Sequence, residues 1–149
     1  MSTKSIAPAL AASLRSLADS QLQTQASRSA TLEAGALAVI AVDAAFATSV
    51  VKTGAADLWI LALALLGLSL GLGVRTLRLP GAVHSGSSVT KTLELRDIHD
   101  DHELEESVLT DLADSVDKNE RTLTRKATIF DQALIFLILA ITVELAGRL

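Results

Sequence analysis

The chain contains no cysteine and no tyrosine, and it has only one tryptophan and two prolines among its 149 residues. Without cysteine it forms neither disulfides nor thiolate metal sites, although this does not identify a cellular compartment. Aromatic residues make up 3% of the chain, and no basic segment is interleaved with them as in a nucleic-acid-binding patch. Phosphate-binding glycine loops, zinc motifs and Ser-His-Asp candidates are also missing from the sequence. We therefore expect no enzyme, no metal site and no cofactor.

Apolar residues are abundant instead. Half of the residues are hydrophobic, and the mean hydropathy is +0.43. They gather in three runs, at about 34–51, 58–74 and 129–147. Each run approaches the roughly 20 residues that a helix needs to cross a hydrocarbon core of about 30 Å. The sequence predicts an all-α integral membrane protein with a transmembrane helical hairpin at 34–74 and a third, C-terminal span.

The third run is the least regular of the three. Asp131 and Glu144 leave an uninterrupted apolar stretch of only 133–143, a length that by itself is typical of a buried soluble helix. Both acids lie near the ends of the run, where carboxylates can meet headgroups or water. We interpret the run as a membrane span.

Basic residues predict the topology. Residues 1–33 and 75–127 together carry 11 lysines and arginines, whereas the other side of the predicted membrane carries only Lys52 and Arg148. By the positive-inside rule, the N-terminus and residues 75–127 are cytoplasmic and the C-terminus is outside. Trp59 suits an interfacial anchor at the outer end of the second span. No secretory signal is evident at the N-terminus.

Two further helices are expected outside the membrane. Residues 1–33 form a cytoplasmic amphipathic helix that continues into the first span, because no proline or glycine separates the two. Residues 75–100 form a flexible cytoplasmic loop with a Pro80-Gly81 turn. Residues 101–149 form a helix that runs into the third span. The apolar residues that we expect to pair these two helices as a stalk are Ile6, Leu10, Leu14, Leu17, Leu104, Val108, Leu112 and Val116.

The helix from residue 101 begins in an acidic segment. Between Glu94 and Glu120 there are 11 acidic residues and two basic ones. Such a segment does not bind nucleic acid or an anionic lipid surface by charge. The run His99-Asp100-Asp101-His102 resembles a metal site, because imidazole and carboxylate suit a divalent transition ion. Its two imidazoles at i and i+3 have no third histidine nearby except His84 in the loop, and a polar helix start is the simpler interpretation.

Asp43 lies near the middle of the first predicted span. An ionised carboxylate there costs at least about 2.5–3.5 kcal/mol, so it should face other helices, face water or be protonated. It either lines a pore, senses protons or fixes assembly, or it is a neutral acid hydrogen-bonded to Ser69 or Thr142 within one subunit. The sequence leaves these alternatives open.

Small residues mark two possible helix contacts. Gly67 and Gly71 form a G-x-x-x-G pattern in the second span, and Ala41 and Ala45 form a small-residue face on the first. Such faces let helices approach closely in lipid, either inside the hairpin or between subunits. Three helices are too few to enclose a wide conduit, so we expect a homo-oligomer in the bilayer.

Two stretches carry a family resemblance. One is Leu17-Ala18-Asp19-Ser20-Gln21-Leu22, leading into residues 32–45, and the other is 119–126, leading into the third span. Together with the order of helices, they resemble small bacterial membrane proteins related to the transmembrane effectors of Pycsar anti-phage systems. The resemblance implies an inner-membrane antiviral defence effector that binds a cyclic pyrimidine nucleotide and impairs the host membrane. The anionic-ligand contacts it implies are Arg28, Arg121, Arg125 and Lys126, which are more simply topology determinants.

Three functions are therefore in view. The first is an oligomeric membrane effector that perturbs or permeabilises the membrane after a cytoplasmic signal, with Asp43, Gly67, Gly71, Ala41 and Ala45 in the pore or assembly. The second is a membrane-anchored scaffold that binds a soluble partner through the acidic helix. The third is a holin-like phage protein, against which the long acidic helix argues.

Overall fold

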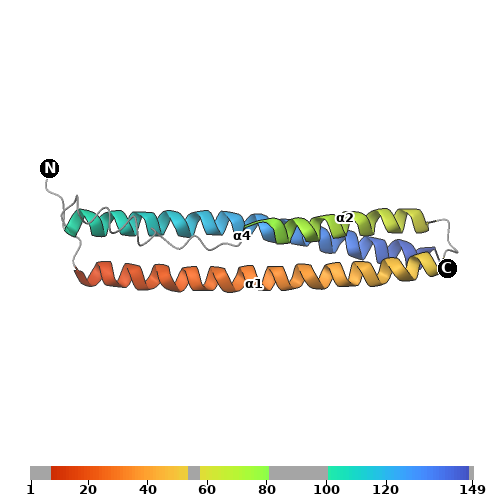
Figure 1. The fold of residues 1–149 in the computed structure, drawn as a ribbon, viewed down its shortest axis with the longest axis horizontal. Helices are drawn as coiled ribbons and strands as arrows, with labels where there is room; N and C mark the ends of the chain where they lie inside the picture. The colour runs from red at the N-terminus through yellow and green to blue at the C-terminus, as the bar shows by residue number, and fades with distance from the viewer. Residues whose placement is uncertain (1–7, 54–57, 81–100, 148–149) are drawn as a thin grey trace. The chain divides into compact units, whose positions relative to one another are not determined.

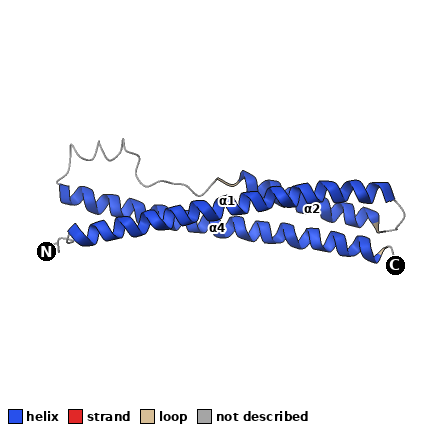
Figure 2. Ribbon diagram, turned by 90° about the horizontal axis from the view of Figure 1, so that it is seen from below, coloured by secondary structure: helices blue, strands red, loops and turns tan. Residues whose placement is uncertain are grey.

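A computed structural model describes residues 8–53, 58–80 and 101–147. Its helices are α1 (Pro8–Thr53), α2 (Trp59–Arg78) and α4 (Asp101–Ala146) (Figure 1). Within these ranges there is no strand (Figure 2), so the all-α prediction is confirmed for the described part of the chain. Most of the predicted loop, at 81–100, lies outside it. The side chains of His99 and His102 also lie outside what the structure describes.

Helices α1 and α4 are uninterrupted for 46 residues each. The only proline of α1 is its first residue, where the missing N–H costs nothing, and α4 contains neither proline nor glycine. Helix α2 stops before Pro80, with Leu79 in the extended conformation that a residue before proline prefers. At 1.5 Å per residue, α1 and α4 are each about 69 Å long, which exceeds what a membrane crossing alone requires.

All three helices are long and apolar enough to cross a membrane. The most apolar 18-residue windows within Ala12–Val51, Trp59–Arg78 and Glu106–Ala146 have mean hydropathies of 2.0, 2.0 and 2.1. The third helix is thus as apolar as the other two in spite of its acids. Asp131 is exposed on it, whereas Glu144 is buried against the other helices.

The chain forms two compact units. We call Met1–Arg28 with Gly81–Leu123 the two-helix unit, because its described helices are the first parts of α1 and α4. We call Ser29–Pro80 with Thr124–Leu149 the three-helix unit, because it contains the remaining parts of α1 and α4 together with α2. The two are described separately below.

In the three-helix unit, α1 and α4 run in the same direction and α2 runs against both (Figures 1 and 2). Contacts between α1 and α4 advance together along the chain, from Glu33 with Lys126 to Gly35 with Phe130. The core consists of apolar residues from all three helices, namely Val39, Val50, Leu66, Ala133, Leu137 and Ala140.

The outer surface of the three-helix unit is apolar as well. Each helix exposes large hydrophobic side chains, among them Leu37, Ile60, Leu68 and Ile138. Helices that are hydrophobic all round are found in large protein cores or in membranes. The unit therefore has the surface expected of a bundle in an apolar solvent.

Two glycines allow close helix contacts inside this unit. A Cβ atom at Gly35 would lie 2.9 Å from the ring of Phe130, and one at Gly73 would lie 3.1 Å from Ile40 Cγ1. At Gly67 and Gly71 a Cβ atom would meet nothing within 4 Å. The hairpin thus packs through Gly73, and the two glycines of the G-x-x-x-G pattern face outward.

This difference predicts the outcome of a matched pair of substitutions. Gly73→Val should force its branched side chain into Ile40 and destabilise the fold by about 1–3 kcal/mol, the usual cost of overpacking. Gly71→Val should leave the stability of a single subunit nearly unchanged. Thermal unfolding of both variants in detergent, followed by helical circular dichroism, measures the difference. Equal unfolding temperatures would contradict the α1–α2 packing.

Candidate functional site

A charged cluster lies between α1 and α4 in the three-helix unit. Lys126 is 0% exposed. Its ammonium group donates to Glu33 Oε1 at 2.6 Å and to Ser29 Oγ at 3.3 Å. Ser29 in turn donates to Glu33 Oε1 at 3.2 Å. The buried cation therefore has a carboxylate and a hydroxyl as partners, which a buried charge requires.

The cluster keeps Glu33 charged. The hydrogen bond from Lys126 lowers the pKa of the Glu33 carboxyl below its ordinary value of 4.5, although partial burial opposes the shift. The Glu33 side chain remains partly exposed. Glu33 directly precedes the first apolar run and Lys126 precedes the third, so the pair joins equivalent points of two parallel helices.

Asp43 has the opposite character. It is 2% exposed, and neither of its carboxylate oxygens has a hydrogen-bond partner among the described residues. Ser69 lies beside it, but its hydroxyl donates to the main-chain carbonyl of Ala133 at 2.9 Å. Thr142 donates to Ile138 O at 2.8 Å. Both hydroxyls thus donate to main-chain carbonyls.

The predicted small-residue faces lie on the surface of the three-helix unit. Gly67 and Gly71 are exposed on α2, and Ala41 and Ala45 are exposed on α1. Since the hairpin packs through Gly73 instead, these four residues leave two faces on which another helix could approach closely.

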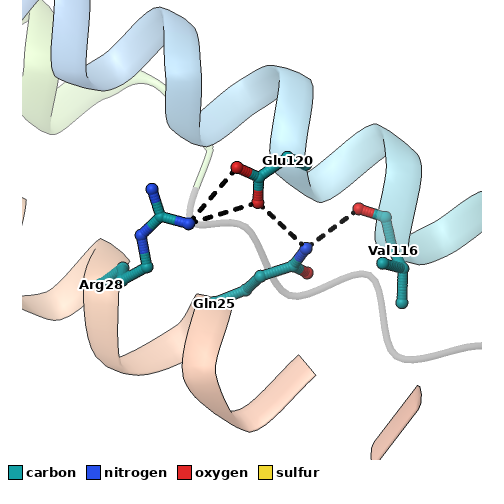
Figure 3. A network of polar contacts seen from close by, with 4 residues as sticks. All are labelled: Gln25, Arg28, Val116 and Glu120. Atoms are coloured by element: carbon teal, nitrogen blue, oxygen red, sulfur yellow. Dashed lines mark hydrogen bonds and ion pairs between the residues drawn. The ribbon is translucent and has the colours of Figure 1, made fainter. Parts of the chain in front are cut away.

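Two of the four predicted anionic-ligand contacts are already paired with carboxylates. In the two-helix unit, Arg28 Nη1 lies 3.3 Å from Glu120 Oε1 and 3.4 Å from Oε2 (Figure 3). In the three-helix unit, Lys126 is paired with Glu33 as described above. Arg121 and Arg125 are exposed. Arg28 and Glu120 are both about half exposed, so this ion pair is a weak one that solvent and salt screen.

The cations were predicted from the sequence, but their partners were not. Ser29 and Gln25 belong to no motif, and Glu33 and Glu120 lie in the stretches 32–45 and 119–126 without having been assigned a role. One available signal was positional, since Glu33 and Lys126 each stand just before an apolar run that is predicted to cross the membrane in the same direction. A buried pair between such positions follows once the two helices are known to be neighbours.

Comparison of the chain with protein-family models, with curated proteins and with solved structures finds no match. Among the described residues there is no group of histidine, cysteine and acidic side chains that could hold a metal ion. The candidate site is thus defined by Asp43, by the Lys126–Glu33 pair and by the outward small-residue faces.

The Glu33 carboxyl predicts a pH dependence of stability. Because its pKa is lower in the folded chain than in the unfolded one, its contribution is complete above pH 4.5 and is lost as the pH falls through the lower, folded value. Wild type should therefore unfold at a higher temperature than Glu33→Gln at pH 7, and the two should converge in stronger acid. A difference that is constant between pH 7 and pH 3 would show that the charge of Glu33 contributes nothing.

Proposed function

We propose that the chain is a three-span membrane effector that assembles from several copies and permeabilises the membrane after a cytoplasmic signal. The observation that carries this proposal is the buried, unpartnered carboxylate of Asp43 within an apolar helix bundle. Acids inside membrane spans are costly and rare, and they commonly mark polar pathways or assembly contacts.

Membrane insertion is supported by the surface and direction of the helices. The three-helix unit is apolar inside and outside, and its α1 and α4 run parallel with α2 reversed, as three successive crossings require. Arg75 and Arg78 stand in the last turn of α2, and Trp59 is its first residue. With the excess of lysine and arginine, this favours a bacterial inner-membrane protein whose N-terminus and residues 75–127 are cytoplasmic.

Assembly is supported by the two open small-residue faces. Gly67 with Gly71 and Ala41 with Ala45 permit close approach of helices from other copies, where van der Waals packing drives association in lipid. Several copies are also needed because three helices cannot enclose a wide conduit.

Hydration of Asp43 would supply free energy for opening the assembly. In the closed arrangement its carboxylate is sealed among α1, α2 and α4 without a hydrogen-bond partner. A rearrangement that turns Asp43 toward a water-filled path between copies would hydrate it and recover part of the roughly 2.5–3.5 kcal/mol that burial in a span costs. A signal that binds the open arrangement more tightly then shifts the population toward it.

The two-helix unit is the proposed receiver of the signal. The resemblance to Pycsar effectors favours a cyclic pyrimidine nucleotide, whose phosphate could replace Glu120 as the partner of Arg28. The existing contacts of 3.3 Å and 3.4 Å are long for a charged pair, and the arginine is half exposed. Exposed Arg121 would supply a second cation in the same unit.

A second candidate is a membrane-anchored scaffold that binds a soluble protein. Its specific support is an apolar groove between α1 and α4 in the two-helix unit, lined by Leu14, Leu17, Leu109 and Leu112. In this case the three-helix unit would be an anchor, and substitution of Asp43 would change neither assembly nor membrane integrity.

Substitutions of Asp43 and Gly71 distinguish these functions. Asp43→Leu replaces the carboxylate with an apolar side chain of similar size, so it should favour the closed arrangement and relieve the growth arrest that wild type causes in bacteria supplied with cyclic UMP or cyclic CMP. Gly71→Val should reduce the copy number measured by native mass spectrometry while leaving the fold intact. Leu68→Val, a conservative change at an exposed position of α2, is the matched control.

Unchanged growth arrest and unchanged copy number in Asp43→Leu would contradict a role in the pore or in assembly. A monomeric wild type that causes no growth arrest even in the presence of cyclic UMP and cyclic CMP would favour the scaffold.

A further inference from the structure

A groove runs between α1 and α4 in the two-helix unit. It consists of two adjoining cavities of about 310 Å³ and 360 Å³. Gln21, Val116 and Asp117 line both, so the two are immediate neighbours. From Leu14 to Arg28 the groove follows about four turns of α1, or roughly 21 Å at 1.5 Å per residue. This length suits a helix better than a small molecule.

The first cavity is apolar. Leu14 and Leu17 of α1 and Leu109 and Leu112 of α4 line it. Leu17 is 57% exposed and Leu14 is 40% exposed, although both point along this groove. No helix among the described residues of this unit covers them. Two helices alone therefore leave an apolar face that a third helix would bury.

The second cavity contains a buried acceptor without a donor. Gln25 is 5% exposed, and its Nε2 donates to Val116 O at 3.1 Å and to Glu120 Oε2 at 3.4 Å (Figure 3). Its other amide atom, Oε1, is buried and has no partner among the described residues. Buried acceptors are normally paired, so the donor for this oxygen is expected outside the described residues.

Charge defines the donor further. The carboxylates of Asp117 and Glu120 line the same cavity as Gln25, and Arg28 is the cation that opposes them there. Residues 101–120 of α4 carry eight acidic residues and one lysine. A second copy would bring an identical acidic helix to this groove and be repelled by it, whereas a lysine or arginine would be attracted.

We propose that this groove binds an amphipathic helix of a partner protein, with an apolar face against Leu14, Leu17 and Leu112. An arginine or lysine of the partner donates to the carboxylate of Asp117, which is exposed at the groove. The recognition is of the helix-in-groove kind, with anchors at i, i+3 or i+4 and i+7. The inference rests on the second candidate function, whose partner it specifies, and does not depend on membrane permeabilisation.

The test uses the full chain in phosphatidylcholine nanodiscs and fluorescent 18-residue amphipathic peptides. One peptide has a leucine face with a single arginine at its edge, and a second has glutamine in place of that arginine. Binding is followed by fluorescence anisotropy and corrected with empty nanodiscs, because amphipathic helices also bind lipid. The arginine peptide should bind at least about tenfold more tightly, the effect of one charge-assisted hydrogen bond.

Two protein variants locate the contact. Asp117→Asn should weaken binding of the arginine peptide about tenfold and should change binding of the glutamine peptide little. Asp114→Asn removes the same charge from an exposed position outside both cavities and should change binding less than twofold. Raising the salt concentration should reproduce the effect of Asp117→Asn on the arginine peptide.

Several results would overturn the proposal. They are binding of neither peptide, equal binding of both, and equal effects of the two variants. Self-association that Leu17→Glu abolishes would assign the groove to a second copy. Binding of a small amphipathic amine without any peptide binding would assign it to a small ligand. Peptide binding by a chain that never permeabilises membranes would contradict the proposed effector function and leave this inference intact.

Discussion

The pairing of Lys126 with Glu33 is the constraint on which the three-helix unit depends. An ammonium group with no exposed surface is tolerable only with a carboxylate partner, and here that partner lies at 2.6 Å. Apolar helices slide past one another at little cost, so a single buried ion pair can select one register. With Glu33 opposite Lys126, Gly35 meets the ring of Phe130 and α1 and α4 run in parallel.

Asp43 lies ten residues, or nearly three turns, further along α1 than Glu33, and its surroundings differ. The packing that satisfies Lys126 leaves both oxygens of Asp43 without a partner, and Ser69 beside it donates elsewhere. Lys126 thus holds the helices in place, and in the proposed effector Asp43 favours their rearrangement. In the proposed effector, the closed bundle bears the free-energy cost of burying Asp43, and opening would recover part of that cost.

The sequence was sufficient for the helices and insufficient for their contacts. Hydropathy and the positions of Pro80 and Asp101 predicted the apolar helices and their ends, because these depend on local composition. Which glycine packs inside the hairpin depends on how α2 is rotated, and Gly73 rather than Gly67 or Gly71 faces Ile40. The partners of Arg28 and Lys126 depend on the register between α1 and α4. The sequence alone does not give this register, because small apolar residues pack against one another in many registers. Gln25 had no pattern to identify it.

The most direct test of the central claim is dye release from liposomes that contain the purified wild-type protein, with and without cyclic UMP or cyclic CMP. The proposed effector should retain the dye in the absence of nucleotide and release it when one of the two is added to the side bearing residues 75–127. Retention of the dye under every condition, by a protein shown to be inserted and oligomeric, would contradict it.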